Sequence, residues 1–198
     1  MKFSKTYVNI LNVAKKKFRS HGYSAVGIGE ILAESGVSRS SLYHFFPGGK
    51  EELAQAVLHN IHQESISRLE SFFFQGRDPV QEICSYFLAK ADEIDRGDNR
   101  VSVNMLIMET AEVSPRLHKL ACEITDSLNA YFYREIEQCG FSEELTCQVA
   151  STVLSMSLGA MNYCSITGRS SLLRNLVQQL PLLFSANGYR PPVSRETA

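Results

Sequence analysis

Residues 38–50 concentrate side chains that can bind a polyanion: Ser38, Arg39, Ser40, Ser41, Tyr43, His44 and Lys50. At about 100° per residue, a helix that begins at Arg39 places Ser40, Tyr43 and His44 on one side and its apolar residues on the other. Hydroxyl, cationic and aromatic groups on an outward face suit phosphates and base edges in the major groove of DNA. Lys50, at the start of the next helix, suits a phosphate as well. The alternative is that Tyr43 and His44 pack as an aromatic pair inside the domain.

A metal site is a second chemistry to consider, because His59 and His62 are three residues apart and Glu64 is near them. No third ligand follows at a diagnostic spacing, so we expect no metal. The sequence also lacks a glycine-rich phosphate loop, a G-x-S-x-G nucleophile motif and a paired-carboxylate motif. We therefore expect neither an enzyme nor a cofactor.

The cysteines are odd in number and form no C-x-x-C pair. We interpret them as small buried or half-buried hydrophobic residues, with a redox switch as the alternative. The five are Cys84, Cys122, Cys139, Cys147 and Cys164.

Charge is distributed unevenly along the chain. Residues 1–50 carry eight lysines and arginines against two acids, a net charge of +6, whereas the remaining 148 residues carry twelve against nineteen, a net charge of −7. A basic head on an acidic body indicates that the head alone meets a polyanion. A solvated lysine-rich helix face, centred on residues 15–17, is the other interpretation.

The elements that must position these residues are all predicted to be helices. Apolar residues recur at steps of three and four, and no strand alternation or hairpin turn is present. We expect nine helices: 4–21, 28–35, 39–46, one from 49 to near 76, 79–94, 101–112, 115–139, 143–167, and a last one from about 172 that Pro181 kinks or ends. Two short helices joined by a glycine-containing turn at 36–38 form a helix-turn-helix.

The domain organisation follows from these helices. We expect a helix-turn-helix domain at 1–48, a helical ligand-binding and dimerisation domain at 49–188, and a disordered tail at 189–198. Hydrophobic residues make up 44% of the chain and charged residues 21%, as in soluble globular proteins. No stretch of 18 apolar residues and no leader peptide is evident, so we expect a cytoplasmic protein without a membrane partner.

The motif Gly36-Val37-Ser38-Arg39-Ser40-Ser41-Leu42-Tyr43-His44-Phe45-Phe46, followed by Lys50-Glu51-Glu52-Leu53, resembles the signature of the tetracycline-repressor (TetR) family. The joint at residues 47–50, one residue longer than usual, resembles the LmrA/YxaF-like branch. The resemblance covers about residues 5–58, and the body matches in helix count and order.

This resemblance implies a DNA-binding regulator, by family default a repressor, in which Ser38, Arg39, Ser40, Tyr43 and His44 face double-stranded DNA and Lys50 holds its backbone. Ser41 flanks that face. The chain departs from the family at three places. Ser40 stands where Gly or Ala is common, Phe45 stands where the family often has histidine, and Val26-Gly27 replaces the usual Thr-Thr or Thr-Ser before the second helix. These departures concern single contacts.

The body is expected to bind a small aromatic or drug-like effector and to form a homodimer that reads a palindromic operator. Both expectations come from the resemblance. Close-approach positions at 155–160 and an apolar ridge of Leu172, Leu176 and Leu180 would form the dimer face. The alternative is a constitutive architectural DNA-binding protein without an effector. Aromatic and flexible apolar side chains suit a pocket, although each one also suits a core; the candidates are Tyr86, Phe87, Met105, Met108, Tyr131, Phe132 and Tyr163, with Glu109 as a polar anchor.

Overall fold

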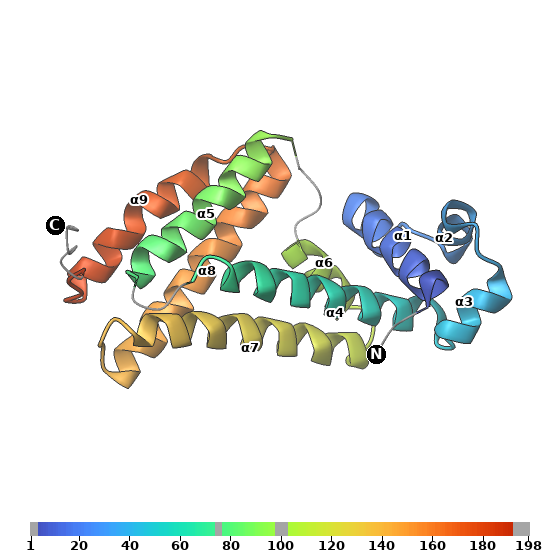
Figure 1. Ribbon diagram of the computed structural model, residues 1–198, viewed down its shortest axis with the longest axis horizontal. Coiled ribbons are helices and arrows are strands. Elements are labelled where there is room, and N and C mark those ends of the chain that lie inside the picture. The colour runs from blue at the N-terminus through green and yellow to red at the C-terminus, as the bar shows by residue number, and fades with distance from the viewer. Residues whose placement is uncertain (1–3, 74–76, 98–102, 192–198) are drawn as a thin grey trace. The chain divides into compact units, whose positions relative to one another are not determined.

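The computed structural model describes residues 4–73, 77–97 and 103–191, and within these ranges the chain forms nine α-helices and no strand (Figure 1). The prediction of an all-helical fold is confirmed. The helices are α1 (Lys5–His21), α2 (Ile28–Ser35), α3 (Arg39–Phe45), α4 (Gly49–Glu70), α5 (Pro79–Asp95), α6 (Val103–Ala111), α7 (Pro115–Glu137), α8 (Glu143–Thr167) and α9 (Ser171–Ala186).

Local sequence signals set most of the helix ends. The hydroxyl of Ser4 accepts a hydrogen bond from the N–H of Tyr7 (3.1 Å), and the carboxylate of Asp78 accepts one from Val80 (2.9 Å). Such caps satisfy N–H groups that have no partner inside the helix. Gly36 ends α2 with φ of 66° and Gly168 ends α8 with φ of 67°, a left-handed conformation that glycine adopts without steric cost.

The expected end of the long fourth helix near residue 76 is wrong, because α4 ends at Glu70. The N–H groups of Ser71, Phe72 and Phe73 bond to carbonyl groups three residues earlier, and the Ser71 hydroxyl bonds to the Arg68 carbonyl (2.6 Å). These shorter-range bonds tighten the last turn and close the helix. Residues 74–76 lie outside the described ranges.

Pro181 does not end the last helix, since α9 continues to Ala186. A proline removes the hydrogen bond to the carbonyl four residues earlier, which is that of Val177. This carbonyl instead accepts the thiol of Cys84 on α5 (3.6 Å). A tertiary contact therefore supplies the missing donor.

Two predicted features extend beyond the described ranges. The expected start of the sixth helix at residue 101 lies outside them, as do residues 192–198 of the expected tail. Tyr189, the first residue of that expected tail, packs on Phe184 and donates a hydrogen bond to Asp78 (2.9 Å).

The chain separates into two compact units. Unit 1 comprises Met1–Ser65 and Arg100–Thr125, and unit 2 comprises Ile66–Asn99 and Asp126–Ala198. Unit 1 therefore holds α1, α2 and α3 together with α6, and α1 packs against each of the other three. The boundary expected after residue 48 remains a prediction.

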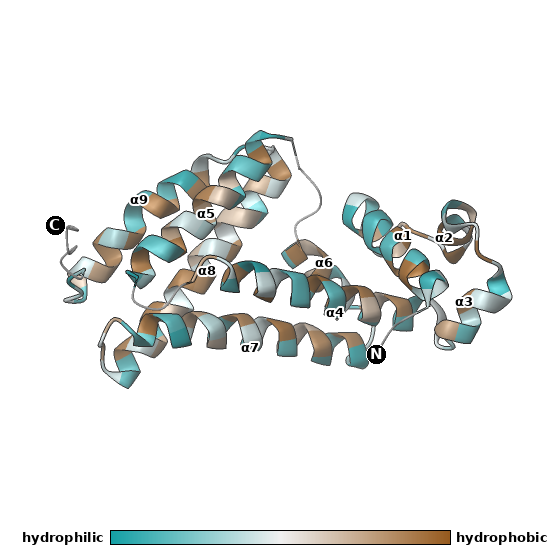
Figure 2. Ribbon diagram, in the orientation of Figure 1, coloured by the Kyte–Doolittle hydropathy of each residue, from teal (hydrophilic) through white to brown (hydrophobic). Residues whose placement is uncertain are grey.

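The core of unit 1 lies between α1, α2, α3 and the first part of α4. Ile10, Phe18, Ile31 and Leu42 are fully buried, and Figure 2 shows hydrophobic and hydrophilic residues alternating around α1. Helices α2 and α3, with eight and seven residues, are too short to be stable alone, so burial of their apolar faces against α1 stabilises them.

In unit 2, α9 packs against both α5 and α8 (Figure 1). Leu176 and Leu180 belong to this core, at 4% and 0% exposure. The expectation that they form an outward ridge is therefore wrong: they point inward, whereas Leu172 remains 38% exposed. No helix in the described ranges combines the length and apolar character required to span a membrane.

Candidate nucleic-acid interface

Helix α3 has one buried edge and one exposed edge. Leu42 is fully buried and Phe46, just after the helix, is 2% exposed, with its ring stacked on Tyr7 at 5.1 Å between centroids. Arg39 and His44 are exposed, and Tyr43 is 41% exposed. The exposed edge of α3 thus carries a guanidinium, an imidazole and a phenol, which is the orientation expected from the sequence.

Ser38 organises the start of α3. Its hydroxyl accepts a hydrogen bond from the N–H of Ser41 (3.2 Å), donates to the hydroxyl of Ser41 (2.9 Å) and lies 3.0 Å from that of Ser40. Ser38 and Ser40 are exposed and Ser41 is half-buried. Three hydroxyl groups therefore cluster at an exposed helix start, where N–H groups and hydroxyls can donate to phosphate oxygens.

The joint between α3 and α4 depends on two glycines. Gly49 has φ of 65°, and a Cβ added there would lie 3.4 Å from Cε1 of Tyr43. The N–H of Gly48 donates to the carboxylate of Glu52 (2.7 Å). Gly49 thus provides both the left-handed turn and the space in which the Tyr43 ring lies.

Lys50 is half-buried in the first turn of α4. Its ammonium lies 4.2 Å from the centroid of the Tyr23 ring and 3.5 Å from the Ser24 carbonyl oxygen, to which it donates. Burial lowers the pKa of Lys50, while the charges of Glu109 and Glu30 oppose that shift. The lysine is therefore held by the loop between α1 and α2, and its expected contact with a phosphate stays a prediction.

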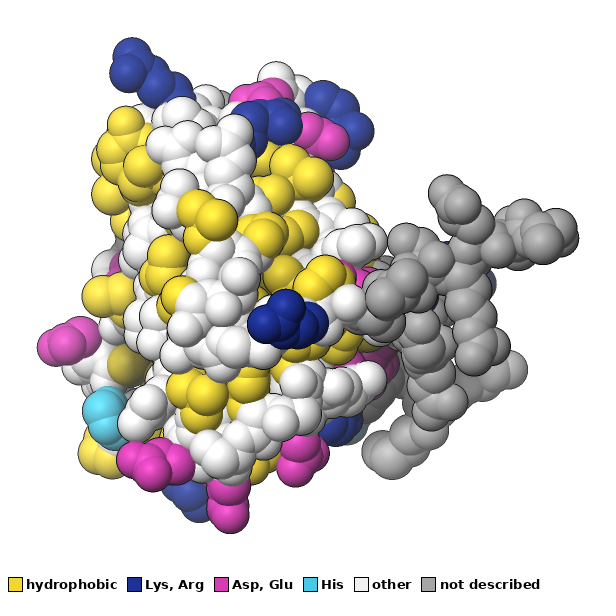
Figure 3. Space-filling view, turned by 90° about the vertical axis from the view of Figure 1, so that its left-hand side faces the viewer, with side chains coloured by type: hydrophobic (Ala, Val, Ile, Leu, Met, Phe, Trp, Pro, Cys, Tyr) yellow, Lys and Arg dark blue, Asp and Glu magenta, His cyan; other side chains and the backbone are white. Residues whose placement is uncertain are grey.

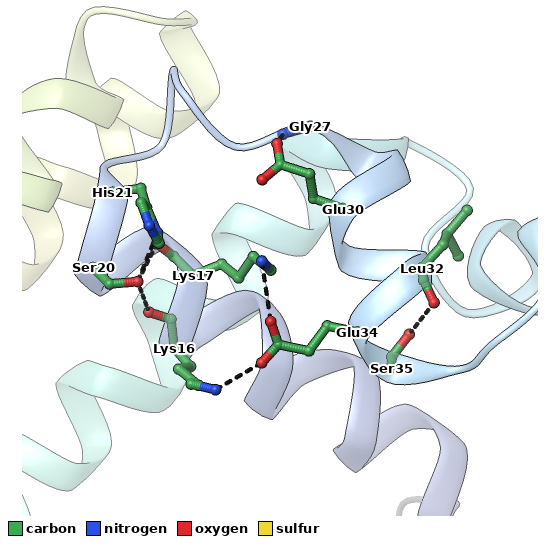
Figure 4. Close-up of polar contacts among 9 residues, drawn as sticks. All are labelled: Lys16, Lys17, Ser20, His21, Gly27, Glu30, Leu32, Glu34 and Ser35. Atoms are coloured by element: carbon green, nitrogen blue, oxygen red, sulfur yellow. Dashed lines mark hydrogen bonds and ion pairs between the residues drawn. The ribbon is translucent and has the colours of Figure 1, made fainter.

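The start of α2 lacks a hydroxyl cap, as expected from Val26-Gly27. The carboxylate of Glu30 instead accepts a hydrogen bond from the N–H of Gly27 (3.0 Å), as Figure 4 shows. This places an acidic side chain at a helix start, where the helix dipole stabilises it.

The lysines in the middle of α1 bind other helices of the head. Glu34 on α2 accepts Lys16 at 2.7 Å and Lys17 at 3.0 Å (Figure 4), and Lys15 binds Glu64 on α4 at 2.6 Å. Hydrogen bonds from Lys16 and then Lys17 lower the pKa of Glu34. No local pattern predicts these ion pairs, because the partners are 17 or more residues apart in the sequence. The positive charge at residues 15–17 is thus largely neutralised inside unit 1.

The histidines of α4 do not gather further ligands. His59 is exposed, while burial and the nearby His59 lower the pKa of His62. Among the residues that the structure describes, no three His, Cys, Asp or Glu side chains are arranged to hold a metal ion.

Four of the eight predicted ligand-binding residues come together in unit 2. Tyr86, Phe87, Tyr131 and Phe132 are buried in one aromatic cluster, with Phe87 at 5.2 Å from Tyr86 and 6.2 Å from Phe132 between ring centroids. Tyr131 lies 6.3 Å from Phe132. Burial raises the pKa of Tyr86 to about 12. Tyr163 lies apart from this core arrangement, 37% exposed on α8.

The other three residues belong to α6 in unit 1. Met105 and Met108 are 37% and 60% exposed. Both carboxylate oxygens of Glu109 accept backbone hydrogen bonds from the loop between α1 and α2. The Glu109 carboxylate is therefore hydrogen-bonded within unit 1. Its partner Tyr23 is 86 residues away in the sequence, so no local pattern could reveal this contact.

A groove of about 500 Å³ is present within unit 1, and none of the predicted ligand-binding residues lines it. Its walls come from α1, α4 and the end of α3, and include Tyr7, Val8, Phe45, Gln55 and His59.

A helix-turn-helix head with an exposed polar α3, followed by six further helices, defines a class of bacterial DNA-binding regulators. Residues 10–57 match the family model of bacterial regulatory proteins of the tetR family, and residues 79–179 match the C-terminal domain of LmrA/YxaF-like transcriptional regulators. The chain is 30% identical to the HTH-type transcriptional regulator YxaF of Bacillus subtilis over 181 residues, which cover 90% of this chain and 95% of that protein. This chain belongs to the TetR family and is a DNA-binding transcriptional regulator.

Further similarities agree with this assignment. The HTH-type transcriptional regulator LmrA of Bacillus subtilis is 25% identical over 86% of this chain and 92% of its own length. A TetR regulator from Legionella pneumophila has the same fold, with a TM-score of 0.79 at 18% identity over 92% of this chain and 99% of its own. The reduced form of E. coli NemR also has a TM-score of 0.79, at 19% identity over 96% of this chain and all of its own.

Proposed function

We propose that this regulator is a repressor that leaves its operator when a small aromatic or drug-like effector binds. The observation that carries the DNA-binding part is the exposed edge of α3, where Arg39, Tyr43 and His44 face solvent while Leu42 is buried. The regulator acts without a catalytic step, in the cytoplasm, where its DNA target lies.

The contacts with DNA divide by chemistry. Arg39 and His44 are the side chains that reach base edges, since cationic and ring N–H donors match acceptors in the major groove. Ser38, Ser40, Ser41, Tyr43 and Lys50 contact phosphates, because hydroxyl and ammonium groups donate to phosphate oxygens and fix the register of the protein on DNA.

A homodimer would place two copies of α3 in successive major grooves of a palindrome. The outer side of α8 carries Met156, Tyr163 and Ile166, which are 37%, 37% and 73% exposed, and α9 adds Leu172 and Leu182. A Cβ on Gly159 would meet no atom within 4 Å, so a partner helix can approach there.

The surface in Figure 3, seen from the side on which α9 lies in Figure 1, supports such an interface. Hydrophobic side chains lie among uncharged ones. A basic side chain lies near the centre of this face, and the other charged side chains lie towards its edges. Exposed apolar surface with few charges is typical of a protein–protein contact.

The effector would bind in unit 2, among Tyr86, Phe87, Tyr131 and Phe132, since aromatic side chains suit an aromatic ligand. Their rings already contact one another. Entry of a ligand therefore requires these rings to separate, and the energy of that rearrangement is available to change the DNA-binding state.

Selection of bound duplexes from a random pool tests the DNA-binding part. We expect a palindromic consensus whose half-sites are about 10 base pairs apart, centre to centre. Recovery of unrelated sequences without symmetry would refute the operator and the dimer together.

A thermal-shift screen with aromatic compounds tests the effector. A compound that raises the unfolding temperature should also weaken operator binding by roughly 5- to 150-fold in fluorescence anisotropy. If no compound stabilises the protein, the alternative of a constitutive architectural DNA-binding protein without an effector is favoured. The mutual packing of the four aromatic rings is the observation that supports this alternative.

A further inference from the structure

The loop between α1 and α2, residues 22–27, holds a carboxylate from α6. The N–H of Tyr23 donates to Oε2 of Glu109 at 2.8 Å, and the N–H of Ser24 donates to Oε1 at 2.7 Å. Two successive backbone N–H groups that point at one anion form a well-known anion-binding arrangement. Hydrogen bonds to an ionised acceptor are stronger than those between neutral groups.

Lys50 completes this site from the start of α4. Its ammonium stands over the Tyr23 ring and donates to the Ser24 carbonyl, so it binds the same two loop residues as the carboxylate. Burial favours the neutral form of Glu109, yet the N–H groups of Ser24 and Tyr23 and the charge of Lys50 hold the pKa of this carboxyl below its ordinary value. Glu109 is therefore charged at neutral pH.

The backbone and side chains of the loop are shaped for this contact. Gly22 has φ of 83°, a conformation that favours glycine, and a Cβ there would lie 3.0 Å from Oε2 of Glu109 and crowd the carboxylate. The Tyr23 ring is 7% exposed and packs on Phe18 at 5.4 Å between centroids. The loop thereby connects Glu109 to the core of the head.

A second bond lies beside the first. The hydroxyl of Ser114, just before α7, donates to the carboxylate of Glu51 at 2.8 Å. Glu51 is the neighbour of Lys50 in the first turn of α4. The segment from α6 to the start of α7 therefore forms hydrogen bonds with two parts of unit 1, the α1–α2 loop and the first turn of α4.

We propose that Glu109 is a positioning residue for operator recognition: its contact with Tyr23 and Ser24 fixes the α1–α2 loop and, through that loop, the ammonium of Lys50. The inference rests on the proposed phosphate contact of Lys50. The contacts of α3 with the bases fix the position of the protein on the operator, and therefore the phosphate that faces Lys50. A misplaced Lys50 ammonium would no longer contact that phosphate. Operator affinity then falls more than affinity for unrelated DNA, where the protein can adjust its register.

The test compares Glu109→Gln with Glu112→Gln, a matched control that removes the same charge from an exposed side chain three residues later. The probes are the duplex recovered from the random-pool selection and a scrambled duplex of equal length. We expect Glu109→Gln to weaken operator binding at least about fivefold relative to Glu112→Gln, and binding to scrambled DNA by less than about twofold. Hydrogen exchange at the Tyr23 and Ser24 amides should become faster in Glu109→Gln alone.

Two outcomes would overturn the inference. One is faster exchange at both amides with unchanged operator affinity, since the contact would then be lost without effect on recognition. The other is an equal loss of affinity for both duplexes. If Glu109→Gln does not fold, Glu109→Asp, which keeps the charge but is too short to reach both N–H groups, is judged by the same criteria. Failure of the proposed function is distinguishable, because the wild-type protein would then show no preference for the selected duplex.

Discussion

The ammonium of Lys50 lies 4.2 Å from the centre of the Tyr23 ring, and this cation–π contact joins the first turn of α4 to the loop after α1. Tyr23 is itself buried against Phe18. The position of a charge proposed to bind DNA is thus determined by an aromatic ring of the core of the head.

Replacement of this lysine tests its contact with phosphate. Lys50→Ala should weaken binding to the operator and to unrelated duplexes by the same factor, and reduce the slope of log affinity against log salt by about 1. Fluorescence anisotropy over a salt series measures both. Lys119→Ala is the control, because it removes an equal charge from an exposed position on α7. A loss restricted to the operator would make Lys50 a reader of bases.

Ser38 allows folding to be separated from DNA binding. Ser38→Ala removes the cap of α3 and should lower the free energy of unfolding by about 1 kcal/mol. Ser38→Asp keeps an acceptor for the Ser41 N–H and should retain stability. Its negative charge repels phosphates, so the DNA affinity of this variant should fall although the protein stays stable. Chemical denaturation and anisotropy give the two quantities. Full DNA affinity in Ser38→Asp would place the start of α3 away from the phosphates.

Gly49 is predicted to be intolerant of a side chain. Gly49→Ala forces a φ of 65° on alanine and crowds the Tyr43 ring, so stability should fall by about 1 to 2 kcal/mol. Gly29→Ala is the matched control: a Cβ there meets no atom within 4 Å on helix α2, and stability should rise by roughly 0.5 to 1 kcal/mol. Denaturant midpoints compare them. Equal changes in the denaturant midpoint for the two variants would show that the backbone between α3 and α4 adapts to a side chain at residue 49 without loss of stability.

The proposed dimer depends on the apolar outer side of α8. Ile166→Asp places a charge on a residue that is 73% exposed in the single chain, so the monomer should remain folded while the dimer dissociates. Analytical ultracentrifugation measures the change. Leu88→Asp, on an exposed position of α5, should leave the association unchanged. A dimeric Ile166→Asp protein would mean that the copies meet elsewhere.

The cysteines should differ in reactivity. Burial raises the pKa of Cys84 to about 11 and that of Cys139 to about 12, and it also raises the pKa of Cys164. A raised pKa keeps these thiols neutral and unreactive at about pH 8, because the thiolate is the nucleophile. A disulfide reagent should therefore modify the exposed Cys122 and Cys147 rapidly, and the other three only in denaturant. Rapid reaction of all five in the native protein contradicts this prediction.

Local features of the fold could be predicted from the sequence. The helix from Arg39 and its orientation follow from the spacing of Leu42 and Phe46 against Tyr43 and His44. Features that depend on a group distant in sequence could not be predicted. Pro181 lies inside α9 because the Val177 carbonyl finds the Cys84 thiol, which is 93 residues away.

The sequence by itself determined the all-helical class, the helix-turn-helix and the edge of α3 that faces outward, because periodicity and capping act within a few residues. Only the tertiary structure decided that Glu109 binds the loop at Tyr23 and Ser24, that Glu34 takes up Lys16 and Lys17, and that Leu176 and Leu180 point into the core. Such contacts join side chains whose distance in space bears no relation to their separation along the chain, and these contacts form only when the packed helices bring the partners together.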